Sequence, residues 1–221
     1  VTSMRYQITE TDNVQSSFLR LGQAPGVMYT NRTRRLPVGV VVMHSDSDYL
    51  SFSAGIELAE RGMTVLCANA ESSMPMLMKM LTVKDAVEHL RAMPGIEKVV
   101  LFGHSGGATL MTAYQSAAEN GIEVFRKFGM IAKFPNRIPG PPGREGGKPE
   151  FPAADGLMLI DPNWGNGAMM LFSLDPAIED ENGGKMINED LDLFAPRNGF
   201  DPEGSTYSES FIDRFQKAQS T

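Results

Sequence analysis

Five residues near the middle of the chain, Gly103-His104-Ser105-Gly106-Gly107, have the types and spacing that suit nucleophilic chemistry. They follow an apolar run over 98–102 and precede a helical pattern, which predicts a strand, a tight turn and a helix with the serine at the apex. Such a turn strains the serine backbone, and glycines two residues away on either side remove collisions with the strand and the helix. The pattern therefore indicates a nucleophile elbow, with a plain glycine-rich turn as the alternative.

A serine hydroxyl attacks a carbonyl only when a base takes its proton, and the usual base is a histidine oriented by a carboxylate. The chain has three histidines, and none follows Ser105. His104 lies inside the turn and leaves it in a different direction from Ser105, while His89 lies in a predicted helix beside charged residues. His44 closes a predicted strand nearer the site. We therefore expect the base to come from outside this chain, with His44 in an unusual arrangement as the alternative.

The elbow and the strand Val38–Met43, which runs into His44, resemble the α/β-hydrolase superfamily over residues 36–165. The resemblance implies an α/β fold with a mainly parallel, doubly wound sheet, a serine hydrolase activity and no cofactor. In that family the acid and then the histidine follow the nucleophile in the chain. This chain departs from that order, so we predict that a C-terminal segment or a second chain supplies the catalytic histidine.

The resemblance also implies an oxyanion hole built from backbone amides. The N–H of Gly106, directly after the nucleophile, is one expected donor. The second is expected from Ser45 or Asp46, in the loop that the family counterpart of His44 helps to shape. For the side chains of Asp46 and Asp48, we predict N-capping of a helix over 50–61 rather than catalysis.

Asp161 follows a predicted strand over 156–160, at the edge of a parallel sheet where catalytic groups gather. Some α/β hydrolases place the triad acid after this strand, which makes Asp161 the candidate acid. The alternative is that Asp161-Pro162 only shapes the turn.

Alternating strand and helix patterns between residues 37 and 119 predict right-handed βαβ units with helices on both faces of the sheet. We expect one domain over 1–221, an irregular Pro/Gly-rich loop over 120–154 and an acidic tail over 175–221 that begins a cap or insertion. The predicted strands span 4–9, 27–30, 37–44, 63–68, 98–102 and 156–160. The predicted helices span 50–61, 82–93, the residues after the elbow, 166–174 and 208–219, and Thr82 with Asp85 is predicted as a capping box.

Composition narrows the possible partners. A net charge of −7 disfavours nucleic acid, which selects a basic surface. The single cysteine, Cys67, excludes an intrachain disulfide and lies in an apolar strand pattern, so we expect it to be buried.

No stretch reaches the ~18 apolar residues of a membrane span, and no signal peptide or metal-ligand spacing is evident, so we expect a cytoplasmic protein without a metal site. Eight apolar residues indicate either an adaptable pocket or core: Met74, Met76, Met78, Met80, Met169, Met170, Trp164 and Phe172.

These observations predict a serine hydrolase that cleaves a carboxylic ester, thioester or lactone of a small molecule through an acyl-enzyme on Ser105. An acyltransferase with the same site is one alternative, because fold does not decide the acceptor. A non-catalytic protein, or one subunit of a composite enzyme, is the other alternative, since no histidine follows the nucleophile.

Overall fold

A computed structural model of the chain describes residues 11–127, 150–163, 166–180 and 186–220. The chain divides into two compact units, Val1–Asn163 and Trp164–Thr221. The first unit contains the central sheet and the predicted site, and the second contains the acidic tail.

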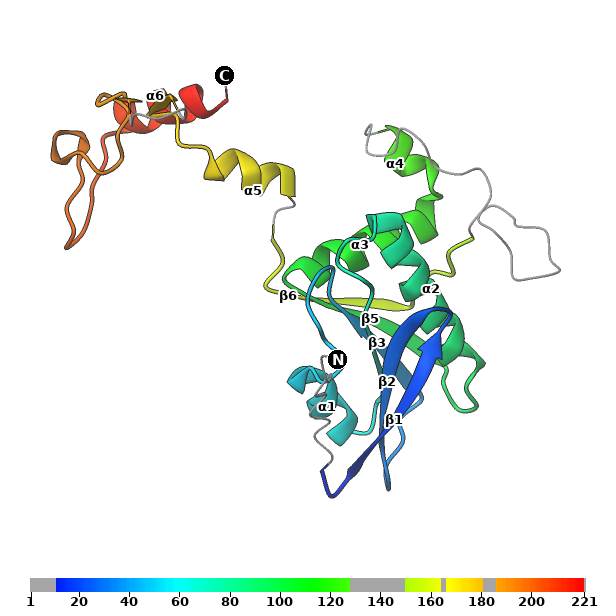
Figure 1. The fold of residues 1–221 in the computed structure, drawn as a ribbon. Helices are drawn as coiled ribbons and strands as arrows, with labels where there is room; N and C mark the ends of the chain where they lie inside the picture. Colours follow the sequence, from blue (N-terminus) through cyan, green and yellow to red (C-terminus); the bar gives the residue numbers. More distant parts are fainter. Residues whose placement is uncertain (1–10, 128–149, 164–165, 181–185, 221) are drawn as a thin grey trace, which may run out of the picture. The chain divides into compact units, whose positions relative to one another are not determined.

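The first unit is built around a six-stranded sheet with the order β1-β2-β4-β3-β5-β6 (Figure 1). Its strands are β1 Val14–Leu21, β2 Ala24–Asn31, β3 Val38–Met43, β4 Thr64–Ala68, β5 Lys98–His104 and β6 Gly156–Ile160. Its helices are α1 Ser53–Glu60, α2 Met76–Ala92, α3 Gly106–Asn120 and α4 Glu123–Lys127. The four strands β4, β3, β5 and β6 are parallel, whereas β1 and β2 form an antiparallel hairpin on β4. The predicted α/β architecture with a mainly parallel sheet is confirmed.

Side chains alternate between the two faces of the central strands, and helices cover both faces (Figure 1). In β3, Val41 and Met43 join the apolar cluster that α2 and α3 cover, while Val40 and Val42 join the cluster that α1 covers. A strand buried on both faces needs a continuous apolar run, which explains why β3 was evident in the sequence.

Helix α2 begins at Met76 rather than at the predicted Thr82, so the capping box of Thr82 and Asp85 is wrong. Thr82 is instead buried in the middle of the helix. Pro75 precedes the first turn, where its missing N–H leaves no helical bond unmade, and the following methionine, leucine and lysine residues are strong helix formers.

Helix α1 begins at Ser53 and has no side-chain cap, so the predicted capping by Asp46 and Asp48 is also wrong. Asp48 Oδ1 instead accepts hydrogen bonds from the backbone N–H of Leu50 at 2.9 Å and from Asn69 Nδ2 at 2.6 Å. This carboxylate therefore fixes the loop between β3 and α1 rather than the helix terminus.

The hairpin of β1 and β2 was only partly predicted. The expected strand over 27–30 is the centre of β2, and the expected strand over 4–9 lies outside the described residues. Strand β1 is buried at its ends, Val14 and Leu21, and polar between them, so its sequence shows no clear alternation. Gly22, with φ +58°, makes the tight turn between the two strands.

The predicted irregular segment over 120–154 begins with α4, and residues 128–149 lie outside the described part of the chain. Its end is held against α3. The Tyr114 hydroxyl donates to the Pro152 carbonyl at 2.8 Å, and the Gln115 side chain exchanges hydrogen bonds with the Ala154 backbone. This attachment sets the entry into β6.

The second unit contains α5 Asn166–Ser173, the hairpin of β7 Ile178–Asp180 and β8 Met186–Ile187, a 3-10 turn Pro196–Asn198, and α6 Glu209–Gln219. The two helices predicted in this region are confirmed. Ser208 caps α6 by accepting a hydrogen bond from the N–H of Phe211 at 3.2 Å. Across the described residues, none of the helices combines the length and apolarity needed to cross a membrane.

Candidate active site

Ser105 lies at the apex of the turn between β5 and α3, as the sequence predicts. Its backbone has φ 52° and ψ −121°, a conformation that costs a non-glycine residue about 1–3 kcal/mol. The Ser105 N–H donates to the carbonyl of Ile160 at 3.0 Å, and the Ser105 carbonyl accepts from the N–H of Ala108 at 3.0 Å. These two bonds hold the strained apex between the end of β6 and the first turn of α3.

The outer glycines of the elbow are required by close backbone approaches. A Cβ atom on Gly103 would lie 2.6 Å from the Cα of Ala108, and one on Gly107 would lie 2.5 Å from the carbonyl oxygen of Met43. Real Cβ atoms do not approach backbone this closely, so a side chain at either position would displace β5, α3 or β3. This is the steric reason for the glycine spacing in the pattern.

The loop after β3 lies directly beside Gly106, the residue that follows Ser105. A Cβ atom on Gly106 would be 2.5 Å from Ser45 Oγ and 3.1 Å from His44 Nε2. The topology thus brings His44, Ser45 and Gly106 together from two neighbouring parallel strands, at the edge where the sequence predicts the site.

The His44 ring orders this loop through its Nδ1 atom. Nδ1 accepts hydrogen bonds from the backbone N–H groups of Asp46 and Ser47, each at 2.9 Å. A neutral imidazole whose Nδ1 is an acceptor carries its proton on Nε2, the atom that faces Gly106. Burial lowers the pKa of His44; the Asp46 carboxylate opposes this effect, and the neighbouring His104 and Lys79 add to it. The neutral ring is therefore favoured.

The two expected oxyanion donors differ in their surroundings. Gly106 is the first residue of α3, where a backbone N–H has no intrahelical acceptor and points out of the helix. The sequence predicts the second oxyanion donor to be the N–H of Ser45 or Asp46. Because the Asp46 N–H already donates to His44 Nδ1, we retain the Ser45 N–H as the candidate.

A buried lysine that the sequence analysis did not single out holds the same loop. The Lys79 side chain is only 6% exposed, and its Nζ donates to Asp46 Oδ1 and to the Ser72 carbonyl, both at 2.9 Å. Asp46 Oδ2 in turn accepts from Ser45 Oγ at 2.5 Å. The hydrogen bonds from Ser45 and then Lys79 lower the pKa of Asp46. The carboxylate thus connects the loop after β3 to α2.

The other two histidines have separate environments. His104 Nδ1 and the Tyr49 hydroxyl are hydrogen-bonded at 2.5 Å, and the Phe52 ring stacks on the His104 ring with centroids 5.6 Å apart. His89 lies in the predicted helix, α2, where its side chain is exposed. His104 therefore packs against the loop before α1 from inside the elbow.

Asp161 follows β6 at the same edge of the sheet as Ser105. His104 pairs with Ile160 in the parallel register, so Ser105 and Asp161 each come directly after a paired residue. Asp161 has φ +47°, which marks a tight turn, and Thr109 Oγ1 donates to Asn163 Oδ1 at 2.8 Å just beyond it. This geometry is compatible with both predicted roles, and the acid role stays a prediction.

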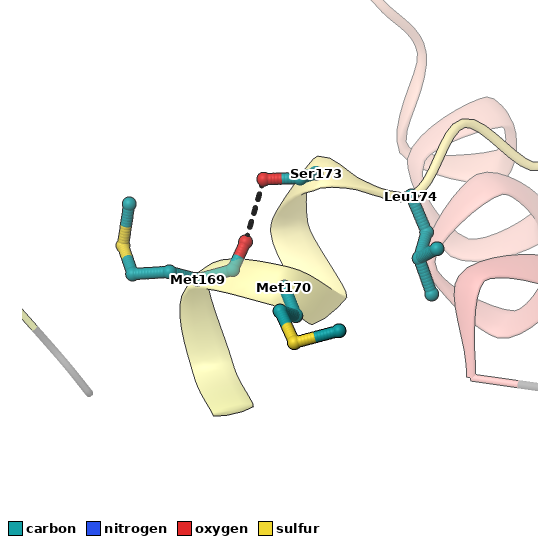
Figure 2. Close-up of a pocket in the computed structure, with 4 residues that line it drawn as sticks. All are labelled: Met169, Met170, Ser173 and Leu174. Carbon is teal, nitrogen blue, oxygen red and sulfur yellow. Dashed lines mark hydrogen bonds between the residues drawn. The ribbon is translucent and has the colours of Figure 1, made fainter. Parts of the chain in front are cut away.

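The methionines divide between core and surface. Met80 is 2% exposed in the core of the first unit. In the second unit, Met169 and Met170 of α5 line a hollow of about 410 Å³ together with Ser173 and Leu174, and Ser173 Oγ donates to the Met169 carbonyl (Figure 2). No group of three or more potential metal ligands occurs within the described part of the chain.

Comparison with known proteins identifies the fold. No protein-family model and no curated protein sequence matches the chain. Among solved structures, it is similar to a C6-C4 SN3-inhibited esterase B from Lactobacillus rhamnosis, with a TM-score of 0.54 and 15% identity over 76% of this chain and 55% of that one. A C4-C4 SN3 tributyrin phosphonate structure of the same esterase gives a TM-score of 0.51 and 14% identity over 71% and 51%. The chain has the α/β-hydrolase fold and spans about half the length of these esterases.

Proposed function

We propose that this chain carries the nucleophile of a serine hydrolase that cleaves small carboxylic esters, thioesters or lactones. The observation that carries the proposal is the position of Ser105. It stands at a strained elbow, φ 52°, at the carboxyl edge of the sheet in an α/β-hydrolase fold. If no side chain were needed at this position, glycine would adopt the same backbone conformation without strain.

In the proposed reaction, Ser105 Oγ attacks the carbonyl carbon of the substrate while a base takes the hydroxyl proton. The carbonyl oxygen becomes an oxyanion that accepts hydrogen bonds from the Gly106 N–H and from the Ser45 N–H. The alcohol or thiol of an ester or thioester leaves with a proton from the conjugate acid of the base, whereas the hydroxyl released from a lactone takes this proton and stays attached to the acyl group. Both routes produce the acyl-enzyme. Water then attacks the acyl group and releases the acid and free Ser105.

We propose that the base histidine comes from a second chain or from a further segment of the same protein, with Asp161 as the candidate acid beside it. Two observations support an external base. His44 turns a protonated Nε2 toward the elbow, so it offers a donor where a base must offer an acceptor. The Nδ1 atom of His104 is engaged by Tyr49.

A fluorophosphonate probe tests the proposal, because it phosphonylates an activated serine. The choice suits the fold, since a structurally similar esterase was solved with a phosphonate. We expect the complete enzyme to be labelled at Ser105 and the variant Ser105→Ala to stay unlabelled. Labelling at another residue in the unchanged protein, or equal labelling of the variant, would contradict the assignment.

A second assay separates hydrolysis by the complete enzyme from activity of this chain alone. If the 221-residue chain hydrolyses a p-nitrophenyl ester with normal efficiency, the external base is refuted. Product analysis with competing alcohols and amines then identifies the acyl acceptor. Predominant transfer to the added acceptor would show an acyltransferase rather than a hydrolase.

A further inference from the structure

The ring of His44 has one nitrogen committed to the loop and the other facing the elbow. Nδ1 accepts from the backbone N–H groups of Asp46 and Ser47 at 2.9 Å each, and Nε2 would lie 3.1 Å from a Cβ atom built on Gly106. The Tyr49 ring packs against the His44 ring with centroids 4.8 Å apart and an interplanar angle of 34°, which limits its rotation. The ring is thus held on three sides in one orientation.

We propose that His44 is a catalytic residue whose Nε2–H donates a hydrogen bond to the substrate carbonyl oxygen as negative charge develops on it. This inference rests on the proposed function, because it concerns the oxyanion formed by attack of Ser105. It adds a side-chain donor to the backbone amides of Gly106 and Ser45. It also assigns His44 the role of a neutral electrophile rather than a base.

The hydrogen bonds of the ring show which of its two nitrogens carries the proton. A neutral imidazole has one N–H and one lone-pair nitrogen. The two backbone N–H groups occupy the lone pair of Nδ1, so the proton must be on Nε2. A base would need the opposite tautomer, in which an Nδ1 proton would face the two N–H groups and break both loop bonds.

Burial is the main cause that lowers the pKa of His44 and favours the neutral ring, and the neighbouring titratable groups act in both directions: Asp46 raises this pKa, whereas His104 and Lys79 lower it. Asp46 belongs to the same loop, Lys79 comes from α2 and His104 from the end of β5. Asp46 is paired with Lys79 at 2.9 Å, so its charge is partly compensated before it can attract a proton to His44. The ring therefore stays neutral and can polarise a carbonyl without giving up its proton.

Two substitutions of His44 separate the donor role from the loop-ordering role. In His44→Asn, the side-chain oxygen takes the place of Nδ1 and can still accept from the N–H groups of Asp46 and Ser47, as in an Asx turn, but nothing reaches the position of Nε2. In His44→Gln, the longer amide can place an N–H near the position of Nε2 but does not reproduce the short loop contacts.

If Nε2–H is a donor in the reaction, kcat of the complete enzyme falls by about 10²–10³-fold in His44→Asn, as for removal of one oxyanion donor, while KM and the melting temperature change little. His44→Gln then keeps a higher kcat than His44→Asn. If His44 only orders the loop, the ranking reverses. Equal kcat values, or a faster asparagine variant, would overturn the proposal.

A spectroscopic readout on the unchanged protein does not depend on turnover or on the folding of a variant. We expect nitrogen NMR of His44 at neutral pH to show the Nε2–H tautomer, with the Nε2 proton moving downfield after Ser105 is phosphonylated, because a phosphonyl oxygen accepts from it. An Nδ1–H tautomer, an imidazolium or an unmoved proton would overturn the proposal. Absence of labelling at Ser105 in the complete enzyme would instead refute the hydrolase function itself, and this role with it.

Discussion

Substitution of Gly103 by alanine tests the steric logic of the elbow. The new Cβ would lie 2.6 Å from the Cα of Ala108, 2.6 Å from the carbonyl oxygen of Gly107 and 2.7 Å from the nitrogen of Ala108. All three atoms belong to the backbone of α3, so no side chain can rotate away. The strain can be relieved only if β5 and α3 move apart.

The expected loss of stability follows from this geometry. Overpacking in a well-packed site costs about 1–3 kcal/mol, and contacts with backbone alone favour the upper end of that range. Replacement of glycine also removes unfolded-state entropy, which offsets about 0.4–1 kcal/mol. We therefore expect the free energy of unfolding to fall by about 2–2.6 kcal/mol. For a chain of this size that corresponds to a lower melting temperature by about 4–10 °C.

Urea unfolding followed by far-UV circular dichroism measures the effect. The matched control is Gly156→Ala in β6, where the new Cβ would meet Val100 methyl groups at 3.4 and 3.8 Å, which is ordinary contact. We expect the free energy of unfolding of this control to lie within about 0.5–1 kcal/mol of that of the unchanged protein. The reasoning would be refuted if Gly103→Ala left the free energy of unfolding unchanged, or if both variants lowered it equally.

Three further outcomes follow from individual contacts. The Cys67 thiol is fully buried, and burial raises its pKa. A thiol reagent should therefore modify one thiol per chain only after the protein unfolds, and fast modification of the folded protein would contradict this. Tyr114→Phe removes the hydroxyl that donates to the Pro152 carbonyl, and calorimetry should show a loss of about 1 kcal/mol, whereas an unchanged melting temperature would show that the bond contributes nothing. The hydrogen bond from the Val99 backbone N–H, and after it the neighbouring cations, lower the pKa of the Asp155 carboxyl below its ordinary value of 3.8. The carboxylate therefore stabilises the folded protein above pH 3.8, and this stabilisation is lost as the pH falls through the lowered pKa. Asp155→Asn should therefore cost about 1 kcal/mol at neutral pH, and this difference should shrink in acid; a constant difference would exclude the carboxylate as its cause.

The central elements could be predicted because their signals are local. The apolar runs of β3 and β5 and the glycines around Ser105 reflect burial on both faces and a turn whose steric demands fall on adjacent residues. Strand β1 gave no such signal, because it lies at the edge of the sheet and only its ends are buried. Its pairing with β2 depends on a neighbour rather than on its own periodicity.

The polar contacts of the site could not be predicted, because they depend on how separate elements meet. The late start expected for α2 left Lys79 outside the helix. Once the helix begins at Met76, Lys79 lies three residues after Met76 and four before Val83, on the buried stripe. A charged residue on such a stripe signals a partner, yet the sequence does not indicate that the partner is Asp46. The tautomer of His44 likewise depends on how the chain turns after β3.

The left-handed backbone of Ser105 sets stability and chemistry against each other at a single position. Glycine would adopt φ 52° freely, so one substitution relieves about 1–3 kcal/mol of strain, of which the added unfolded-state entropy of glycine offsets about 0.4–1 kcal/mol. The remainder is still a sizeable share of the 5–15 kcal/mol that stabilises a typical domain. A library of variants selected for thermal stability alone would therefore be enriched in Ser105→Gly, with the hydroxyl lost. Under the proposed hydrolase function, stabilisation of this protein for use as a catalyst requires position 105 to be held constant while the rest of the chain varies.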